Sequence, residues 1–185
     1  MPRSGEDARR RLQQAALELY RERGFDRTTT AEIAARAGVT ERTFFRHFPD
    51  KREVLFDGES ALREVMTEAV AEAPEGLAPL DILRRVFATA GQRIEQNRSF
   101  TEPRFEVIAA TPALRERDLA KHASLVEAVA QALRQRGVDA RSADLATRAG
   151  WAVFDRAARD WIDDPGQSMS VHLDRAFEDL RGLIA

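Results

Sequence analysis

The sequence predicts an all-α fold of about nine helices. Apolar residues recur at intervals of three and four over most of the chain, which is the spacing of one face of an α-helix. The sequence has no run with the strict alternation of a half-buried β-strand. Glycine and proline fall between the apolar stripes, where helices are expected to end. Together these patterns predict helices joined by short turns.

The N-terminal part of the chain predicts three of these helices. An apolar stripe within the first twenty residues predicts a first helix, which Gly24 ends. Thr28 or Thr29 is then placed to cap a second helix, and Glu32 follows Thr29 at the spacing of a capping box.

A tight turn at Gly38 separates this second helix from a short third one, which Thr40 caps and which ends near Phe48. A helix-turn-helix needs a small residue at its turn, because a side chain there collides with the first helix. Val39, Phe44 and Phe48 have the spacing that anchors the third helix in a core. The residues left facing outward are Thr40, Glu41, Arg42, Thr43, Phe45, Arg46 and His47.

The rest of the chain predicts six longer helices. Lys51 is expected to begin a long helix that continues to about Ala73, before the Pro- and Gly-containing stretch 74–79. The later helices are expected at about 80–97, 99–110, 112–136, 142–163 and 169–184. We expect two domains, a DNA-binding domain over residues 1–52 and a second helical domain over residues 53–185.

Charge is distributed unevenly between these two parts. Residues 1–52 contain 12 Lys and Arg against 8 Asp and Glu, a net charge of +4, and residues 53–185 contain 17 against 23, a net charge of −6. A basic N-terminal part on an acidic body is typical of a nucleic-acid-binding domain joined to one that does not bind nucleic acid.

Several classes of function are excluded or disfavoured by composition. The chain has no cysteine, which excludes disulfides, zinc sites built on cysteine and thiol catalysis. His122 and His172 lack a partner at ligand spacing, so neither a metal site nor a cofactor is expected. No catalytic triad, phosphate loop or paired catalytic carboxylates indicate an enzyme. No signal peptide or membrane span is recognised, so the cytoplasm is the expected location.

The run GFDRTTTAEIAARAGVTERTFFRHFPDKREVLF resembles the DNA-binding signature of the TetR family of bacterial repressors. The resemblance implies a three-helix DNA-binding head and an all-α body that dimerises and binds a ligand. It implies that Glu41, Arg42, Thr43 and Arg46 read base edges, where arginine suits guanine and glutamate suits the cytosine amino group. It places Thr28 or Thr29, Thr40, Phe45, His47 and Lys51 where family members contact phosphates.

The predicted DNA contacts of Phe45 and Glu41 each have a second interpretation. The family usually has tyrosine where this chain has Phe45, which cannot donate a hydrogen bond to a phosphate but can pack against sugar or a thymine methyl. Glu41 is equally well explained as an acidic residue that the helix dipole favours in a first turn.

The second domain is expected to dimerise and to bind a small effector. In the family the last two helices form the dimer interface, here 142–163 and 169–184, whose apolar residues include Leu145, Trp151, Phe154, Trp161, Leu173, Phe177, Leu180 and Ile184. Ordinary core packing within one chain is the alternative. An apolar effector site is predicted at Phe87, Phe100, Arg104, Phe105, Ile108, Trp151 and Phe154, and ordinary core packing of most of these apolar side chains is the alternative.

The segments ATPALRERDLAKHASLVEAVAQALRQRG and RAGWAVFDRAARDWIDD are similar to C-terminal domains of actinobacterial TetR members, some described as binding acyl-CoA-like ligands. This resemblance implies a long apolar ligand with an anionic end near Arg104. The predicted function is therefore a homodimeric repressor that binds palindromic operator DNA and is released by a small effector. The alternatives are an activator of the same fold and an architectural DNA-binding protein without sequence specificity.

Overall fold

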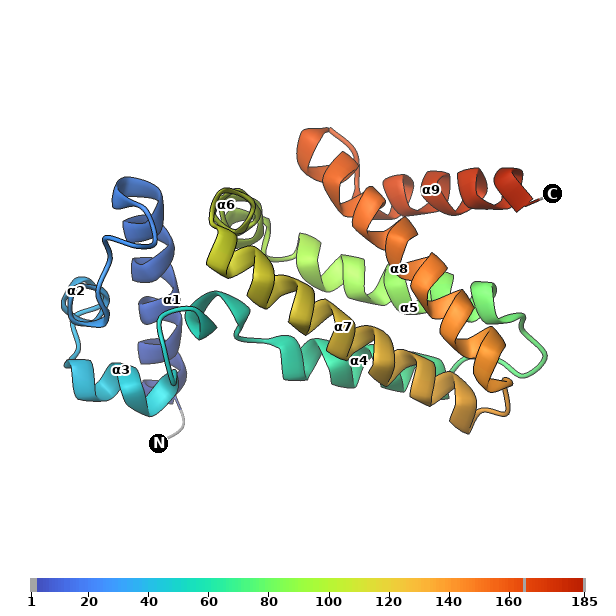
Figure 1. Ribbon diagram of the computed structural model, residues 1–185, viewed down its shortest axis with the longest axis horizontal. Coiled ribbons are helices and arrows are strands. Elements are labelled where there is room, and N and C mark those ends of the chain that lie inside the picture. The colour runs from blue at the N-terminus through green and yellow to red at the C-terminus, as the bar shows by residue number, and fades with distance from the viewer. Residues whose placement is uncertain (1–2, 165, 185) are drawn as a thin grey trace. The chain divides into compact units, whose positions relative to one another are not determined.

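The computed structural model describes residues 3–164 and 166–184, and this part of the chain holds nine α-helices, one 3-10 helix and no strand (Figure 1). The α-helices are α1 (Arg3–Arg23), α2 (Thr30–Arg36), α3 (Glu41–His47), α4 (Glu59–Ala71), α5 (Pro79–Glu95), α6 (Arg98–Ala110), α7 (Pro112–Gln135), α8 (Ala140–Asp163) and α9 (Met169–Ile184). The all-α prediction is confirmed. None of the described helices has a stretch that is both long enough and apolar enough to span a lipid bilayer.

Contacts group the chain into two compact units. Unit 1 contains the chain up to Gly58 together with Ser99–Leu119, and unit 2 contains Glu59–Arg98 together with the chain from Ala120 onward. Unit 1 therefore draws α6 and the first part of α7 into the packing of the N-terminal helices. A domain boundary between residues 52 and 53 stays a prediction.

Unit 1 is built around one buried apolar face of α1. Its core combines side chains of α1, α2, α3, α6 and α7 with the 3-10 helix η1 (Glu53–Phe56). The fully buried members include Leu12, Leu19, Ile33, Phe44 and Leu55. Removing such side chains from water is the main stabilising contribution to folding, at about 1.5–3 kcal/mol for each large one.

The long helix expected from Lys51 to Ala73 is not continuous. The chain forms η1, then bends through an extended Asp57 and through Gly58, whose φ of +103° lies in the left-handed region that favours glycine. Helix α4 begins only at Glu59. The expectation was wrong because apolar residues continue at helical spacing on both sides of the bend, which hides the turn.

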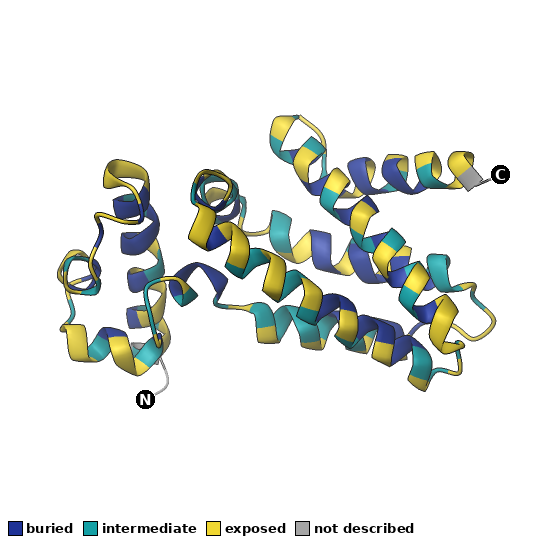
Figure 2. Cartoon of the chain, viewed as in Figure 1, coloured by how far each residue is buried: buried dark blue, intermediate teal, exposed yellow. Residues whose placement is uncertain are grey.

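Unit 2 contains α4, α5, α8, α9 and most of α7, and the buried positions of α5 and α8 form stripes along these helices (Figure 2). Two glycines mark where helices approach closely. A Cβ atom built on Gly150 of α8 would lie 2.9 Å from Cε2 of Phe87, and one built on Gly91 of α5 would lie 2.8 Å from Cγ of Met169. Real Cβ atoms do not approach other atoms this closely, so the close packing of α5 requires a glycine at Gly150 of α8 and at its own Gly91, which faces α9.

Four of the eight apolar residues predicted for a dimer interface are buried within unit 2. Phe154, Trp161, Leu173 and Phe177 are all at most 6% exposed, which fits the alternative of ordinary core packing for these four. Leu145 remains 66% exposed. Trp151 and Leu180 are half-buried, and the side chain of Ile184 lies outside the described residues.

Candidate DNA-binding site

The turn between α2 and α3 has the geometry of a helix-turn-helix. Gly38 adopts a φ of +67° and lets the chain reverse directly after α2. The N–H of Val39 donates to the carbonyl of Ala34 at 2.9 Å, and the N–H of Gly38 donates to the carbonyl of Ala35 at 3.1 Å. This pair of bonds satisfies the last carbonyls of α2 and fixes the direction in which α3 leaves it.

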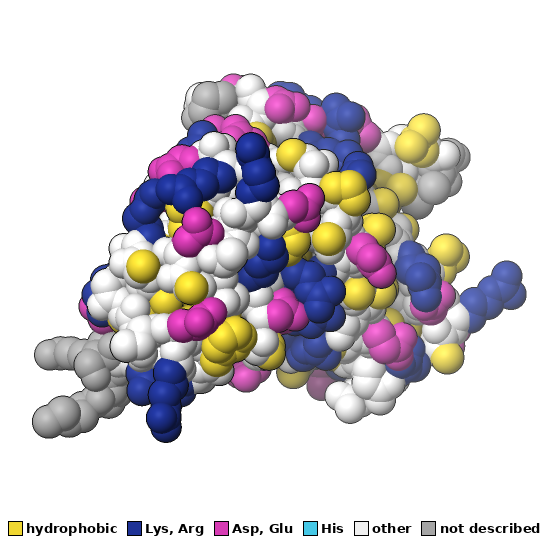
Figure 3. All heavy atoms as spheres, turned by 60° about the vertical axis from the view of Figure 1, so that its left-hand side comes forward, with side chains coloured by type: hydrophobic (Ala, Val, Ile, Leu, Met, Phe, Trp, Pro, Cys, Tyr) yellow, Lys and Arg dark blue, Asp and Glu magenta, His cyan; other side chains and the backbone are white. Residues whose placement is uncertain are grey.

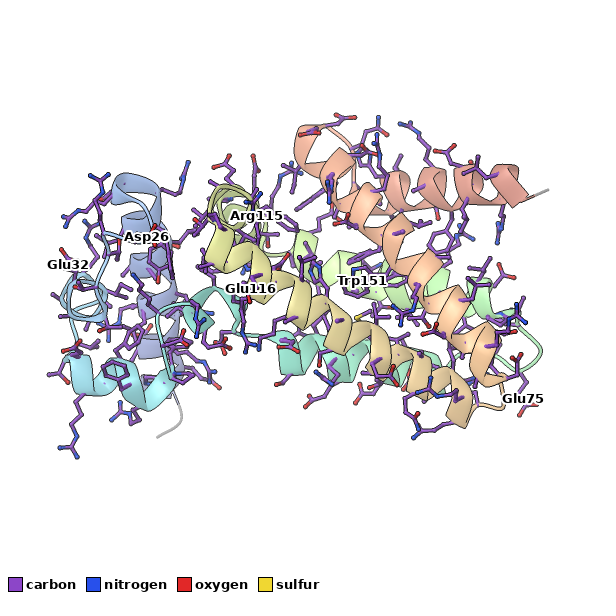
Figure 4. All side chains as sticks on the ribbon, in the orientation of Figure 1. Asp26, Glu32, Glu75, Arg115, Glu116 and Trp151 are labelled. Atoms are coloured by element: carbon purple, nitrogen blue, oxygen red, sulfur yellow. The ribbon has the colours of Figure 1, made fainter. Side chains whose placement is uncertain are left out.

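Both short helices are capped as the sequence predicts. The Thr29 hydroxyl accepts from the N–H of Glu32 at 3.2 Å, and the Glu32 carboxylate accepts from the N–H of Thr29 at 2.9 Å. The hydrogen bond from the Thr29 backbone is the main reason that the pKa of Glu32, on α2 in Figure 4, lies below its usual value. The hydroxyl of Thr40 accepts from the N–H of Thr43 at 3.2 Å and caps α3.

Helix α3 has one buried side and one exposed side. Phe44 and Phe48 are at most 2% exposed and pack into the core of unit 1, and Val39 packs against that core, as the sequence predicts. Residues facing outward include Glu41, Arg42, Phe45 and Arg46, and Phe45 is 52% exposed. A short helix anchored by two aromatic rings presents its polar face at a fixed angle.

The two arginines of α3 differ from the other arginines around them. Among the arginine side chains described between Gly5 and Gly58, only Arg42 and Arg46 make no hydrogen bond or ion pair. The others are engaged with Asp, Glu or backbone carbonyl groups: Arg9, Arg10, Arg11, Arg21, Arg23, Arg27, Arg36 and Arg52. Basic and acidic side chains are interspersed on the face shown in Figure 3. Both arginine side chains without a hydrogen-bond or ion-pair partner in this stretch therefore lie on α3.

The side chain of Lys51 points toward the protein backbone and not into solvent. Its ammonium donates to the carbonyls of Phe25 and Thr28 at 2.8 and 2.9 Å and lies 4.3 Å from the centre of the Phe25 ring. The Tyr20 hydroxyl donates to the Lys51 carbonyl at 2.6 Å. Lys51 thus holds the loop that leads into α2, an arrangement that the sequence did not indicate. Its phosphate contact stays a prediction.

The two threonines considered for the start of α2 have separate environments. Thr28 is 1% exposed, and its hydroxyl donates to the carbonyl of Gly24 at 2.9 Å. Thr29 is exposed and is the cap residue. Of the two, Thr29 is the one whose side chain a DNA backbone can approach.

His47 ends α3 beside two arginines. Burial is the main cause that lowers its pKa below the usual 6.5, and the charges of Arg46 and Arg9 lower it further, while Asp57 acts in the opposite direction. Its Nε2 atom is buried without a hydrogen-bond partner among the described residues. At neutral pH the ring is therefore uncharged.

The residues predicted for an effector site do not belong to one unit. Phe87, Trp151 and Phe154 lie in unit 2, where the rings of Phe87 and Phe154 stack at 4.9 Å between centres and Trp151 meets both at 5.8 Å. The His122 ring lies 5.1 Å from that of Trp151 on α8 (Figure 4). The sequence did not predict His122 in this aromatic cluster, because its helix position alone does not indicate which rings it meets.

The other predicted effector residues are in unit 1: Phe100, Arg104, Phe105 and Ile108. Phe100 and Ile108 pack in the core of that unit. The Arg104 guanidinium donates to the carbonyl of Leu55 at 2.5 Å and lies 3.8 Å from the carboxylate of Asp118. Burial lowers the pKa of Arg104. These contacts tie α6 and α7 to η1, and a ligand contact at Arg104 stays a prediction.

A helix-turn-helix with unpaired arginines on its second helix, carried by an otherwise helical chain, defines a DNA-binding protein. Residues 12–57 match the family of bacterial regulatory proteins called tetR, and residues 77–184 match the MftR C-terminal domain. The chain belongs to the TetR family of transcriptional regulators. It is a regulator of transcription and not an enzyme.

Individual relatives agree with this assignment. The chain is 29% identical over 187 residues to the HTH-type transcriptional regulator TcmR of Streptomyces glaucescens, covering 94% of this chain and 82% of TcmR. FadR of Thermus thermophilus, a TetR-family repressor solved with lauroyl-CoA, is 29% identical with a TM-score of 0.55, covering 92% of this chain and 91% of FadR.

A more distant protein has a similar fold. SmeT, the repressor of a multidrug efflux pump of Stenotrophomonas maltophilia, was solved as a complex with triclosan and has a TM-score of 0.66. It is 20% identical, and the match covers 93% of this chain and 90% of SmeT. At this identity the likeness concerns the fold alone.

Proposed function

We propose that this regulator is a repressor that binds a palindromic operator as a homodimer and leaves it when a small apolar effector binds. The observation that carries the DNA-binding part is the pair of unpaired arginines on the exposed side of α3, Arg42 and Arg46. An unpaired guanidinium can form two hydrogen bonds to the O6 and N7 atoms of guanine in the major groove. We expect Thr43 to read base edges beside these arginines, and Thr40, Phe45 and His47, with Thr29 at the start of α2, to contact the sugar-phosphate backbone.

Release follows from geometry and from a difference in ligand affinity. Two recognition helices fit successive major grooves only when they lie about 34–36 Å apart or a multiple of that distance. An effector that binds better to a dimer with another separation lowers operator affinity. The effector can lower operator affinity only by as much as its own affinity differs between the two arrangements of the dimer.

Selection of bound fragments from genomic DNA tests the operator proposal. We expect one inverted repeat to be enriched by the wild-type protein. Arg42→Ala and Arg46→Ala should each weaken binding to this repeat by about 1–3 kcal/mol. Each should also reduce the base preference at one position of each half-site. Arg85→Ala, which removes an exposed arginine of α5, is the matched control and should bind like wild type. Retention of unrelated fragments without a consensus would instead support an architectural protein.

The proposed dimer uses α8 and α9. Although their aromatic residues are mostly buried in unit 2, Leu145 of α8 and Val171 and Leu183 of α9 stay 41–84% exposed. Exposed leucine and valine on two terminal helices favour burial against a second copy. Leu145→Glu should shift sedimentation from dimer to monomer, whereas Leu119→Glu on α7 should not. An unchanged dimer in Leu145→Glu would place the interface elsewhere.

The effector proposal rests on the aromatic cluster of Phe87, Trp151, Phe154 and His122. Stacked rings favour an apolar ligand, and the similarity to FadR makes lauroyl-CoA a reasonable probe. The chain has two tryptophans, so each can be followed alone. We expect lauroyl-CoA to change the emission of half-buried Trp151 in Trp161→Phe, and to leave that of fully buried Trp161 unchanged in Trp151→Phe. Equal changes in both variants would argue against this site.

Repression and activation are separated by a reporter assay in cells. A reporter under the selected operator should be silent with the protein and active without it, and the effector should restore expression. The opposite response would identify an activator of the same fold. Such a regulator acts on the bacterial chromosome, so we place it in the cytoplasm.

A further inference from the structure

The first residues of α2 and α3 are linked by a side-chain hydrogen bond. The hydroxyl of Thr30 donates to Oε1 of Glu41 at 2.5 Å, although eleven positions separate the two residues. Thr30 is not needed to cap its own helix, because Thr29 and Glu32 form the capping box. The bond therefore has one evident consequence, which is to fix the direction of the Glu41 carboxylate.

The second carboxylate oxygen of Glu41 accepts no hydrogen bond within the described part of the chain, so it is available to a partner from outside. Glu41 is exposed and begins the helix that carries Arg42 and Arg46. In a helix-turn-helix the N-terminal residues of the second helix face the base edges. A carboxylate held in this place meets the donors and acceptors of the major groove.

We propose that Thr30 is a positioning residue that aims Glu41 at the N4 amino group of a cytosine in the operator. This proposal rests on the proposed operator binding. Guanine presents two acceptors in the major groove and thymine presents one, and both repel a carboxylate. In its base pair the amino group of adenine lies between two acceptors, its own N7 and O4 of thymine. The amino group of cytosine has an acceptor, O6 of guanine, on one side only, so cytosine is the base that the carboxylate favours.

The linkage also explains why an acidic residue is tolerated on a DNA-binding surface. A carboxylate without a fixed direction is repelled by the phosphates equally in every DNA sequence, so it only weakens binding. When the Thr30 hydroxyl fixes its direction, the same charge accepts a hydrogen bond at one base pair and repels the alternatives. Glu41 then contributes to discrimination between sequences more than to affinity.

The test compares base preferences from one randomised operator pool. Wild type, Thr30→Val, Thr30→Ser and Glu41→Gln are bound to the same pool, and the retained DNA is sequenced. Valine keeps the shape of threonine without its hydroxyl, and serine keeps the hydroxyl. Circular dichroism establishes that each variant is folded, and Glu41→Gln tests the base contact independently of Thr30.

We expect wild type to prefer cytosine by about tenfold at one position of each half-site. Glu41→Gln should change the preference at that position only. Thr30→Val should reduce the cytosine preference to less than about threefold, and Thr30→Ser should retain it. An inverted repeat that is read identically by wild type and Thr30→Val would overturn the positioning role and leave operator binding intact. Equal weakening of all sequences by Thr30→Val would also overturn it, because that result indicates a phosphate contact. If wild type selects no inverted repeat, both proposals fail.

Discussion

Replacing Lys51 with methionine removes one ammonium group and keeps most of the apolar part of the side chain. The ammonium donates to the carbonyls of Phe25 and Thr28 at 2.8 and 2.9 Å and lies over the Phe25 ring. Hydrogen bonds from a charged group contribute about 1.5–3 kcal/mol each when water is excluded. Because the Lys51 side chain is half-buried, water can replace part of this hydrogen-bond energy. We expect Lys51→Met to lower the free energy of unfolding by about 2–3 kcal/mol.

Urea titration followed by circular dichroism measures this decrease. Arg52→Met is the control, because it removes a neighbouring positive charge that forms a surface ion pair with Asp50 and is 52% exposed. A surface pair of this kind contributes about 0–1 kcal/mol, so the control should unfold close to wild type.

The salt dependence of DNA binding separates loop support from a phosphate contact. If Lys51 acts by holding the loop, Lys51→Met should lower stability and leave the slope of log affinity against log salt unchanged. A phosphate contact predicts the reverse, namely unchanged stability and a slope that becomes shallower by about 0.9 for each phosphate that the variant no longer neutralises. The second pattern would refute the role we assign to Lys51.

Three further predictions test other parts of the structure. Gly150→Ala adds a methyl group 2.9 Å from Phe87 and should lower stability by about 1–3 kcal/mol in urea titration, whereas Gly182→Ala, with open space around it, should be neutral or stabilising. Thr29→Ala removes the cap of α2 and should cost about 1 kcal/mol in the same assay, and an unchanged midpoint would contradict the capping role. Because the pKa of His47 is lowered in the folded state, the unfolded chain takes up the proton first, and the free energy of unfolding should decrease as pH falls below 6.5. His47→Gln should make stability less dependent on pH in that range, and an identical pH profile would show that His47 does not contribute.

The helix-turn-helix could be predicted from the sequence because its determinants are local. Thr29 and Glu32 are three residues apart. The turn after α2 is closed by bonds from the N–H of Gly38 to Ala35, three positions earlier, and from the N–H of Val39 to Ala34, five positions earlier. The bend at Gly58 was not predicted although Asp57-Gly58 is a turn dipeptide, because apolar spacing continues across it. Local signals thus predicted the caps and turns better than the length of the long helix.

The contacts that decide which side chains are free could not be predicted in this way. Lys51 meets carbonyls that lie 23–26 positions earlier, and Thr30 meets Glu41 across the turn. Such pairs depend on how separate helices pack. For the same reason the aromatic residues assigned to one effector site divide between two units, since spacing within a helix does not indicate which other helix covers it.

The pairing of arginines in unit 1 has a consequence for how this regulator searches a chromosome. Arg9, Arg23 and Arg36 each lie beside a carboxylate of the same chain, so their charges are already balanced before DNA is met. Binding to arbitrary sequence is driven by the release of counterions from phosphates, and paired arginines release few. With the proposed base contacts of Arg42 and Arg46, we therefore expect the protein to dissociate quickly from random DNA and to spend most of its residence time at its operator.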